Sequence, residues 1–91
     1  MVIIKLMYRI EYGKQAIKTL RKMPRNTRQR ILHKVNALAS SPCQAANVKK
    51  MLGGENVYRL RVADWRIVYI VEDERLLISI VKIDVRGGIY K

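Results

Sequence analysis

The stretch from Tyr58 to Tyr69 carries the clearest pattern of apolar and polar positions in the chain. Apolar residues alternate with arginines from Tyr58 to Val62, which is the period of a strand with one buried face. The pair Ala63-Asp64 interrupts the alternation, and a second apolar run follows from Trp65 to Val71. The pattern therefore predicts a β-hairpin whose loop is centred on Ala63-Asp64.

An even-numbered loop fixes which residues of this hairpin lie opposite each other, and directly opposed residues share a face. Ala-Asp is not a strong two-residue turn, and an odd-numbered loop would break the shared face. The predicted pairs are Arg61–Arg66, Leu60–Ile67 and Tyr58–Tyr69. One face then holds only apolar residues, namely Tyr58, Leu60, Val62, Trp65, Ile67 and Tyr69. The opposite face holds Arg59, Arg61, Arg66 and Val68.

The face with three arginines points to a function. Like charges directly opposite each other destabilise a sheet, so folding alone gives no reason to gather them. An anionic partner would give one, because a guanidinium group binds phosphate through two parallel hydrogen bonds. The alternative is a solvated strand face that happens to be basic.

Two amphipathic helices are predicted before the hairpin. Apolar residues recur at helical spacing from Gly13 to Met23, with lysines and arginines off that stripe. Pro24 suits the first turn of a second helix from about Pro24 or Arg25, which Ser40-Ser41-Pro42 ends. Helices joined so tightly predict a helical hairpin. The expected buried stripes contain Ala16, Ile17, Leu20, Met23, Ile31, Leu32, Val35, Leu38 and Ala39.

Shorter runs predict the other elements. The apolar segment Val2 to Tyr8 indicates a largely buried strand, and Cys43 to Asn56 indicates a loop. The polar segment Glu72-Asp73-Glu74 indicates a turn, followed by a strand from Arg75 to Ile83. A turn at Asp73-Glu74 gives the pairs Ile67–Ile80 and Trp65–Lys82. The last strand would then end beside the hairpin tip.

These elements define an α+β fold of one domain that spans residues 1–91, in the order β-α-α-β-β-β. The two-helix hairpin would pack on the apolar face of a mainly antiparallel sheet and leave the arginine face open. The C-terminal segment would start near Arg61 and Arg66, so that Arg86 and Tyr90 could reach the arginine face. Asp84, at the start of that segment, is either a proton acceptor or a carboxylate paired with an arginine.

The charge of the chain narrows the choice of partners. Its 91 residues carry a net charge of +12, which favours a polyanion such as nucleic acid, an acidic protein or a membrane surface. One cysteine excludes an internal disulfide, and this fits a reducing cytosolic setting. One His and one Cys are also too few to form a metal site. The segment Val2 to Met7 is too short for a signal peptide or a membrane span.

Several strings of the chain resemble the RelE/ParE toxin superfamily. They are Val48-Lys49-Lys50-Met51-Leu52, Tyr58-Arg59-Leu60-Arg61-Val62, Asp64-Trp65-Arg66-Ile67-Val68-Tyr69 and Arg86-Gly87-Gly88-Ile89-Tyr90. The resemblance implies a RelE-like fold and a toxin of a type II toxin–antitoxin pair. RelE-type members cut messenger RNA in the ribosomal A site, whereas ParE-type members poison DNA gyrase.

The resemblance also assigns roles to residues. It implies a metal-free and cofactor-free endoribonuclease in which the 2′-hydroxyl of the messenger attacks the scissile phosphate. The implied catalytic residues are Arg59, Arg61, Arg66, Arg86 and Tyr90, and further expected RNA contacts are Lys49, Lys50, Arg25 and Arg28. The complete combination of Arg66, Arg86 and Tyr90 favours a RelE-type member.

One departure from the family pattern concerns proton transfer. The best-known RelE pattern has lysines where this chain has Arg59 and Arg61. A lysine with a depressed pKa can act as a general base, whereas an arginine effectively cannot. The only histidine, His33, is expected on the second helix, away from the arginine face. The proton acceptor is therefore unassigned.

The implied partners are messenger RNA, the ribosome and an acidic RelB-like antitoxin, in a toxin–antitoxin hetero-oligomer in the cytoplasm, with no membrane partner. Two alternatives stay open. One is a gyrase poison of ParE type, in which the helices matter more than the basic face. The other is a nucleic-acid-binding relative whose activity was weakened or lost through the two arginine replacements.

Overall fold

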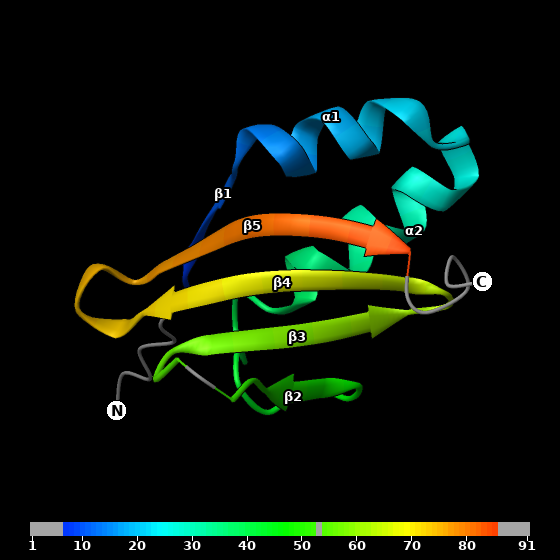
Figure 1. Cartoon of the computed structure of the whole chain (residues 1–91). Coiled ribbons are helices and arrows are strands. Elements are labelled where there is room, and N and C mark those ends of the chain that lie inside the picture. Colours follow the sequence, from blue (N-terminus) through cyan, green and yellow to red (C-terminus); the bar gives the residue numbers. More distant parts are fainter. Residues whose placement is uncertain (1–6, 53, 86–91) are drawn as a thin grey trace, which may run out of the picture.

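One five-stranded sheet, in the order β1-β5-β4-β3-β2, forms the centre of the described chain (Figure 1). The structure is a computed structural model that describes residues 7–52 and 54–85. Strand β1 pairs in parallel with β5, and the other neighbours are antiparallel. The elements are β1 (Arg9–Tyr12), α1 (Lys14–Lys22), α2 (Arg25–Ala37), β2 (Val48–Lys50), β3 (Val57–Val62), β4 (Trp65–Glu72), the 3-10 helix η1 (Asp73–Arg75) and β5 (Leu77–Val85).

The β3–β4 hairpin has the predicted register. Arg61 lies opposite Arg66, and the two-residue loop is Ala63-Asp64. The predicted pairs Leu60–Ile67 and Tyr58–Tyr69 are also present. Ala63 has a positive φ of 54°, a conformation that glycine adopts more easily than alanine. The register predicted for an even-numbered loop is therefore confirmed.

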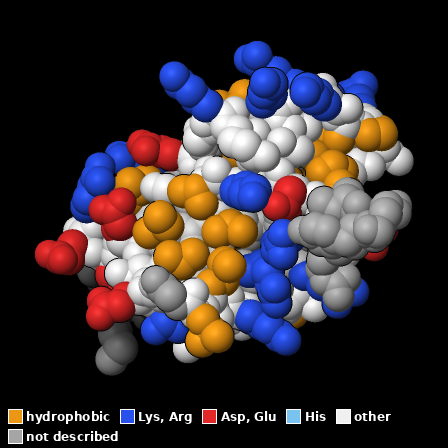
Figure 2. Space-filling model, in the orientation of Figure 1, with side chains coloured by type: hydrophobic (Ala, Val, Ile, Leu, Met, Phe, Trp, Pro, Cys, Tyr) orange, Lys and Arg blue, Asp and Glu red, His pale blue; other side chains and the backbone are white. Residues whose placement is uncertain are grey.

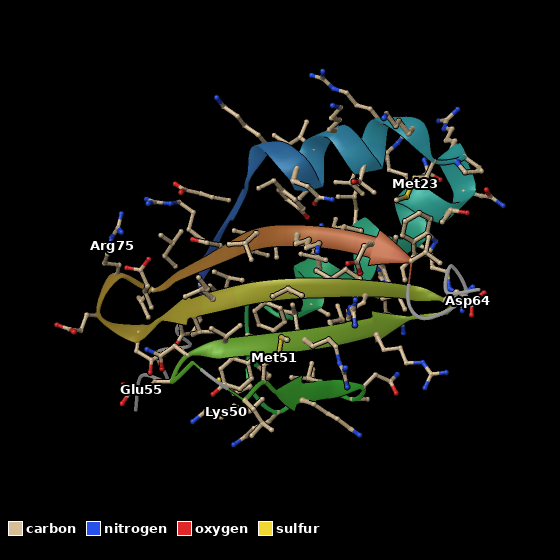
Figure 3. All side chains as sticks on the ribbon, viewed as in Figure 1. Met23, Lys50, Met51, Glu55, Asp64 and Arg75 are labelled. Atoms are coloured by element: carbon tan, nitrogen blue, oxygen red, sulfur yellow. The ribbon has the colours of Figure 1, made fainter. Side chains whose placement is uncertain are left out.

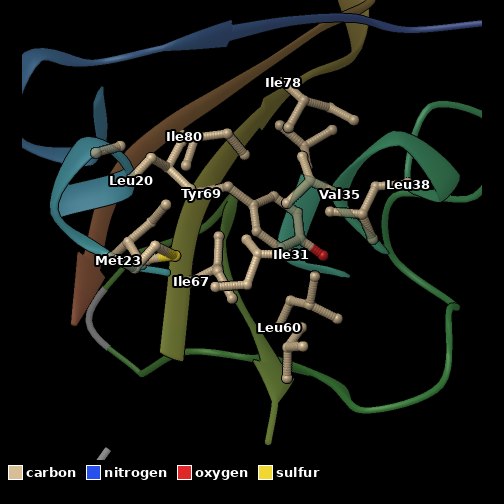
Figure 4. Close-up of a cluster of buried hydrophobic side chains, with 14 residues drawn as sticks. Leu20, Met23, Ile31, Val35, Leu38, Leu60, Ile67, Tyr69, Ile78 and Ile80 are labelled. Atoms are coloured by element: carbon tan, nitrogen blue, oxygen red, sulfur yellow. The ribbon is translucent and has the colours of Figure 1, made fainter. Parts of the chain in front are cut away.

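Both helices pack on the apolar face of the sheet, as predicted, with α1 over β5 and α2 over β3. Ile31 and Val35 of α2 are buried together with Ile67 and Tyr69 of the sheet (Figure 4). The Tyr69 hydroxyl donates a hydrogen bond to the Pro42 carbonyl at 2.5 Å, so its polar atom is satisfied inside the core. Ile17 is an exception to the predicted stripe of α1, because it is 39% exposed.

The side chain of Gln15 joins α1 to β5. Its amide nitrogen donates to the Ile83 carbonyl at 3.0 Å, and its amide oxygen accepts from the Ile83 backbone nitrogen at 2.9 Å. Strand β1 pairs with β5 only at residues 77–80. Gln15 therefore satisfies backbone groups of β5 beyond the end of β1. None of the helices in residues 7–52 and 54–85 is both long and apolar enough to cross a membrane.

The described residues include only the end of the strand predicted over Val2 to Tyr8. The described strand is Arg9–Tyr12, whereas Met7 and Tyr8 lie outside any strand and residues 2–6 lie outside the described residues. The apolar run Val2 to Tyr8 favoured an earlier position. The actual strand is selected by its pairing with residues 77–80, which no local pattern encodes.

The loop predicted over Cys43 to Asn56 contains one further strand. Strand β2 pairs with β3 so that Lys49 lies opposite Arg59. Three residues with two lysines carry no apolar alternation, so this segment has no local strand signal. The order of elements within the described residues is thus β-α-α-β-β-β-β.

The predicted register between β4 and β5 was also wrong. The pairs are Ile67–Ile83 and Trp65–Val85 in place of Ile67–Ile80 and Trp65–Lys82. Four residues connect the strands, because η1 is followed by Leu76 with a φ of 47°. A bulge near Val68 and Tyr69 shifts the pairing again. The last strand nevertheless ends beside the hairpin tip, as expected, since Val85 lies opposite Trp65.

Candidate nucleic-acid interface

The face of the sheet that the helices leave uncovered, here called the open face, carries the three hairpin arginines. Arg61 lies directly opposite Arg66, and Arg59 lies opposite Val68. Their neighbours on the other face are buried, including Leu60 and Ile67. Arg61 is exposed, and Arg59 and Arg66 are half-buried. The prediction that these three arginines lie on one face of the sheet is therefore confirmed.

Strand β2 brings a fourth cation to this face. Lys49 lies opposite Arg59, and opposed residues of antiparallel strands share a face. A hollow of about 330 Å³ lies here, lined by Asn47, Val48, Lys49, Arg59 and Arg61. Three cationic side chains around one small hollow offer the hydrogen-bond donors that an anion such as phosphate requires.

Arg66 forms an ion pair with Asp84 of the neighbouring strand β5. Its Nε and one terminal nitrogen donate to the two carboxylate oxygens of Asp84 at 3.1 and 3.3 Å. Lys82 Nζ lies 3.4 Å from the same carboxylate. Burial disfavours the charged form of Asp84, but the hydrogen bonds and charges of Arg66 and Lys82 outweigh it, so the pKa of this carboxyl lies below its usual value. Asp84 is thus a paired carboxylate, as one of the two sequence interpretations held.

We call Lys49, Arg59, Arg61, Arg66 and Lys82 the basic cluster. Neighbouring strands lie about 4.8 Å apart, and the registers place Lys49, Arg59, Val68 and Lys82 in one row across the sheet. The next row is Arg61, Arg66 and Asp84. Val68 is therefore an apolar floor position between charged side chains from both sides.

Lys82 was missed as a site residue by the sequence interpretation. The wrong β4–β5 register placed it opposite Trp65, which faces the helices. A usable signal was present, since Lys82 and Asp84 flank Ile83, which is fully buried. That alternation places Lys82 and Asp84 on the open face.

The other predicted RNA contacts lie elsewhere. Lys50 follows Lys49 in β2 and so points to the opposite side of the sheet. Arg25 is exposed at the start of α2, whereas Arg28 donates to the Leu20 carbonyl at the end of α1 at 3.3 Å. Arg28 therefore stabilises a helix end in addition to any contact with RNA. Arg86 and Tyr90 lie outside the described residues.

An apolar patch adjoins the basic cluster on the open face. It consists of Met51, Val57 and Ile70, which continue the same registers toward the far end of the hairpin. Figure 2 shows hydrophobic side chains over the middle of the face, with Lys and Arg side chains beside them and along α1. Figure 3 shows Asp64 at the hairpin tip and Arg75 at the other end of the sheet. The open face thus offers an apolar and a cationic surface side by side.

Charge is distributed unevenly over the molecule. No acidic residue occurs between Glu11 and Glu55, whereas Glu72, Asp73 and Glu74 gather at the turn that joins β4 to β5. This turn lies at the end of the sheet away from the hairpin tip (Figure 1). This distribution disfavours the approach of a polyanion at the turn that joins β4 to β5.

The described residues contain no group of three or more His, Cys, Asp and Glu side chains placed to hold a metal ion. His33 is exposed on α2, as predicted, and Cys43 is an exposed free thiol in a loop. Neither lies in the basic cluster.

A sequence profile described as "ParE toxin of type II toxin-antitoxin system, parDE" matches residues 10–90. The chain belongs to the RelE/ParE toxin superfamily. A relative from Methanocaldococcus jannaschii, named as toxin RelE1, is 28% identical over 86 residues, which cover 92% of this chain and 96% of the relative. The family resemblance of the sequence is therefore confirmed, and the chain is the toxin of a toxin–antitoxin pair.

Solved structures of the superfamily share the fold. RelE in the archaeal RelE–RelB complex from Pyrococcus horikoshii is 30% identical, with a TM-score of 0.80, over 91% of this chain and 99% of that one. The isolated RelE toxin of E. coli superposes with a TM-score of 0.76 at 24% identity, over 88% of this chain and 85% of that one. The RelE-like α+β architecture is thus confirmed.

Proposed function

We propose that the chain is a RelE-type endoribonuclease that cuts messenger RNA in the A site of the ribosome. The observation that supports this most is the basic cluster on the open face, where Lys49, Arg59 and Arg61 line one hollow and Arg66 lies beside it. Its action on ribosome-bound messenger would take place in the cytoplasm. RelE-type structures among the relatives support the same choice.

The chemistry would use the messenger's own 2′-hydroxyl as nucleophile on the adjacent phosphate, so that no metal or cofactor takes part. Arg61 and Arg66 would hold the scissile phosphate, and Arg59 would hold a neighbouring one. Preorganised donors aimed at the developing charge of the transition state supply a large part of such rate gains. The phosphate would bind Arg66 beside or in place of its carboxylate partner Asp84.

The C-terminal segment would complete the site. Arg86 would stabilise the transition state, and Tyr90 would stack on a base or hydrogen-bond the phosphate. Strand β5 ends at Val85, opposite Trp65 at the hairpin tip, so the segment that follows starts close to Arg61 and Arg66. Lys50, Arg25 and Arg28 would contact ribosomal RNA outside the cleavage site.

An acidic, RelB-like antitoxin is the proposed protein partner. The structures of the Pyrococcus horikoshii and Methanocaldococcus jannaschii relatives are complexes of RelE with RelB. A net charge of +12 and the apolar patch beside the basic cluster fit a partner that combines acidic side chains with an apolar segment. Such a partner would cover the basic cluster and thereby block access of RNA.

A translating ribosome with a defined messenger tests this proposal. Purified chain is added, and the cleaved 3′ ends are mapped at single-nucleotide resolution. We expect cuts within the A-site codon, and we expect the double variant Arg59→Ala/Arg61→Ala to lose at least about 100-fold in rate.

The double variant Lys14→Ala/Lys18→Ala is the matched control, because it removes the same charge from exposed positions of α1. It should cleave at close to the wild-type rate. Intact messenger with the wild-type chain would contradict the proposed function. Equal losses of cleavage rate in both double variants would show that the arginines of the open face act only through the net charge of the chain.

Poisoning of DNA gyrase is the second candidate function. The specific observation in its favour is that the matching family profile is that of ParE toxins. Supercoiling of relaxed plasmid by gyrase in the presence of the chain separates the two candidates. We expect supercoiling to be unaffected at concentrations that stop translation, and inhibition with intact messenger would favour the ParE-type activity.

A further inference from the structure

The proposed cleavage needs a proton donor that the arginines do not provide. When the 2′-oxygen attacks phosphorus, the P–O5′ bond breaks, and the 5′-oxygen must take up a proton to leave as a hydroxyl group. An arginine is a poor acid because its guanidinium group effectively never loses its proton. Among the described residues beside the three arginines, the candidates for this role are Lys82 and Asp84 on β5 and Lys49 on β2.

Two of these candidates fit the role poorly. The pKa of Asp84 is lowered, so at neutral pH this carboxyl has no proton to give. Lys49 lies on β2, two strands away from Arg66, on the side of the hollow that faces Arg59. Arg66 is the residue of β4 proposed to hold the scissile phosphate.

Lys82 has the required position. Its Nζ lies 3.4 Å from one carboxylate oxygen of Asp84, and the other oxygen lies 3.1 Å from Arg66 Nε. The ammonium and the guanidinium groups thus converge on a single anionic group, which is the arrangement that a phosphate and its leaving oxygen require. Lys82 also lies opposite Val68, the apolar floor position between the cations of β3 and β5.

We propose that Lys82 is the catalytic residue that donates a proton to the 5′-oxygen of the leaving nucleotide. This inference rests on the proposed endoribonuclease function. The 2′-oxygen forms a bond to phosphorus, the P–O5′ bond breaks, and the 5′-oxygen takes the proton from Lys82 Nζ. The proton of the 2′-hydroxyl passes to water, and the Lys82 amine regains a proton from water. The products are a 2′,3′-cyclic phosphate and a 5′-hydroxyl.

Proton donation and simple attraction of RNA make different demands on this side chain. Attraction needs only a positive charge, which an arginine keeps, whereas donation needs a group that gives up its proton. The Lys82 side chain is 57% exposed, so its replacement leaves no cavity in the core. The variants Lys82→Ala and Lys82→Arg therefore separate the two roles without unfolding the chain.

The first experiment measures single-turnover cleavage of messenger on ribosomes saturated with each variant. General acid catalysis contributes about 10²–10⁴-fold, so Lys82→Ala and Lys82→Arg should both lose at least about 100-fold in rate. Ribosome affinity, measured by co-sedimentation, should stay close to wild type in Lys82→Arg. The control Lys18→Ala, which removes an exposed lysine from α1, should keep the wild-type rate.

The second experiment replaces the bridging 5′-oxygen of the scissile phosphate by sulfur. A thiolate is a far better leaving group than an alkoxide, since thiols ionise near pH 8.5, so this substrate needs no proton donor. Wild-type chain and Lys82→Ala should cleave it at similar rates. This recovery is a signature that a purely structural or electrostatic role would not give.

Several results would overturn the assignment. Wild-type rates in Lys82→Ala or in Lys82→Arg on natural messenger would exclude a proton donor at this position. If Lys82→Ala lowers the cleavage rate equally on the oxygen and the sulfur substrate, the lysine acts through its charge or through the structure. A wild-type chain that leaves messenger intact would overturn the proposed function itself, and the role of Lys82 with it.

Discussion

The two faces of the β3–β4 hairpin are built from alternate residues of the same strands, yet they differ in nearly every physical respect. On one face Leu60, Ile67 and Tyr69 are almost completely buried under the helices. On the other face Arg59 and Arg61 line an open hollow. Apolar burial stabilises the fold on the first face, whereas the second face places like charges opposite each other and so costs stability.

The difference suggests that stability and function can be separated residue by residue along these strands. Even-numbered residues of β3 and odd-numbered residues of β4 face the core, and the residues between them lie on the open face, where RNA is proposed to bind. Asp84 partly offsets the repulsion between Arg61 and Arg66 by pairing with Arg66. The variants below test this separation from the largest expected effect to the smallest.

Truncation of the core face should have the largest effect on stability. Ile67 is fully buried, so Ile67→Ala should lower the free energy of unfolding by about 2–5 kcal/mol through lost burial and a cavity. Val68→Ala, one residue along on the open face, is the matched control and should cost clearly less. Urea unfolding followed by circular dichroism measures both, and equal losses would contradict the separation of the faces.

Removal of a satisfied hydroxyl group from the core should have a smaller effect. Tyr69→Phe loses the hydrogen bond to the Pro42 carbonyl and leaves that buried acceptor unpaired, at a cost of about 1–3 kcal/mol. Tyr12→Phe is the comparison, because the Tyr12 hydroxyl is buried without a hydrogen-bond partner among the described residues. That second change should be neutral or stabilising in the same urea titration, and a loss as large as that of Tyr69→Phe would show that the hydrogen bond is not the cause.

The Asp84 carboxylate links the open face to pH. Its pKa is lower in the folded chain than in the unfolded chain, so its stabilising effect is complete above the unfolded value near pH 4 and is lost as pH falls through the folded value. At pH 7 the free energy of unfolding of wild type should exceed that of Asp84→Asn by about 1 kcal/mol. The difference is this small because the Arg66–Asp84 pair is partly exposed. Thermal unfolding from pH 7 to pH 2 should show this gap closing below about pH 4. A gap that is constant over the whole range would rule out the carboxylate as its source.

The hairpin tip should give the smallest change, and it should be a gain. Ala63 has a positive φ, which glycine adopts without strain, so Ala63→Gly should raise the free energy of unfolding by about 0.5 kcal/mol. Cleavage of messenger should not change, because the backbone of the tip already holds this conformation. A lowered stability would mean that the greater freedom of glycine in the unfolded chain outweighs the relief of strain.

The sequence predicted those parts of the molecule that local patterns determine. The alternation around Arg59 and Arg61 gave the hairpin register and its basic face, and helical spacing gave α1 and α2. Strand β2 escaped prediction because three residues with two lysines form a strand only through pairing with β3. The position of Lys82 on the open face was missed for a different reason: the predicted turn at Asp73-Glu74 gave a wrong register, whereas the actual register depends on a four-residue turn and a bulge.

The most direct test of the account measures two properties of one variant, Arg61→Ala, in the same preparation. Arg61 is exposed and lies opposite Arg66, so we expect a free energy of unfolding within about 0.5 kcal/mol of wild type or slightly above it. Ribosome-dependent cleavage should fall by about 100–1000-fold. A variant that cleaves at the wild-type rate, or that loses activity only in proportion to a loss of folded protein, would contradict the claim that the open face acts on RNA.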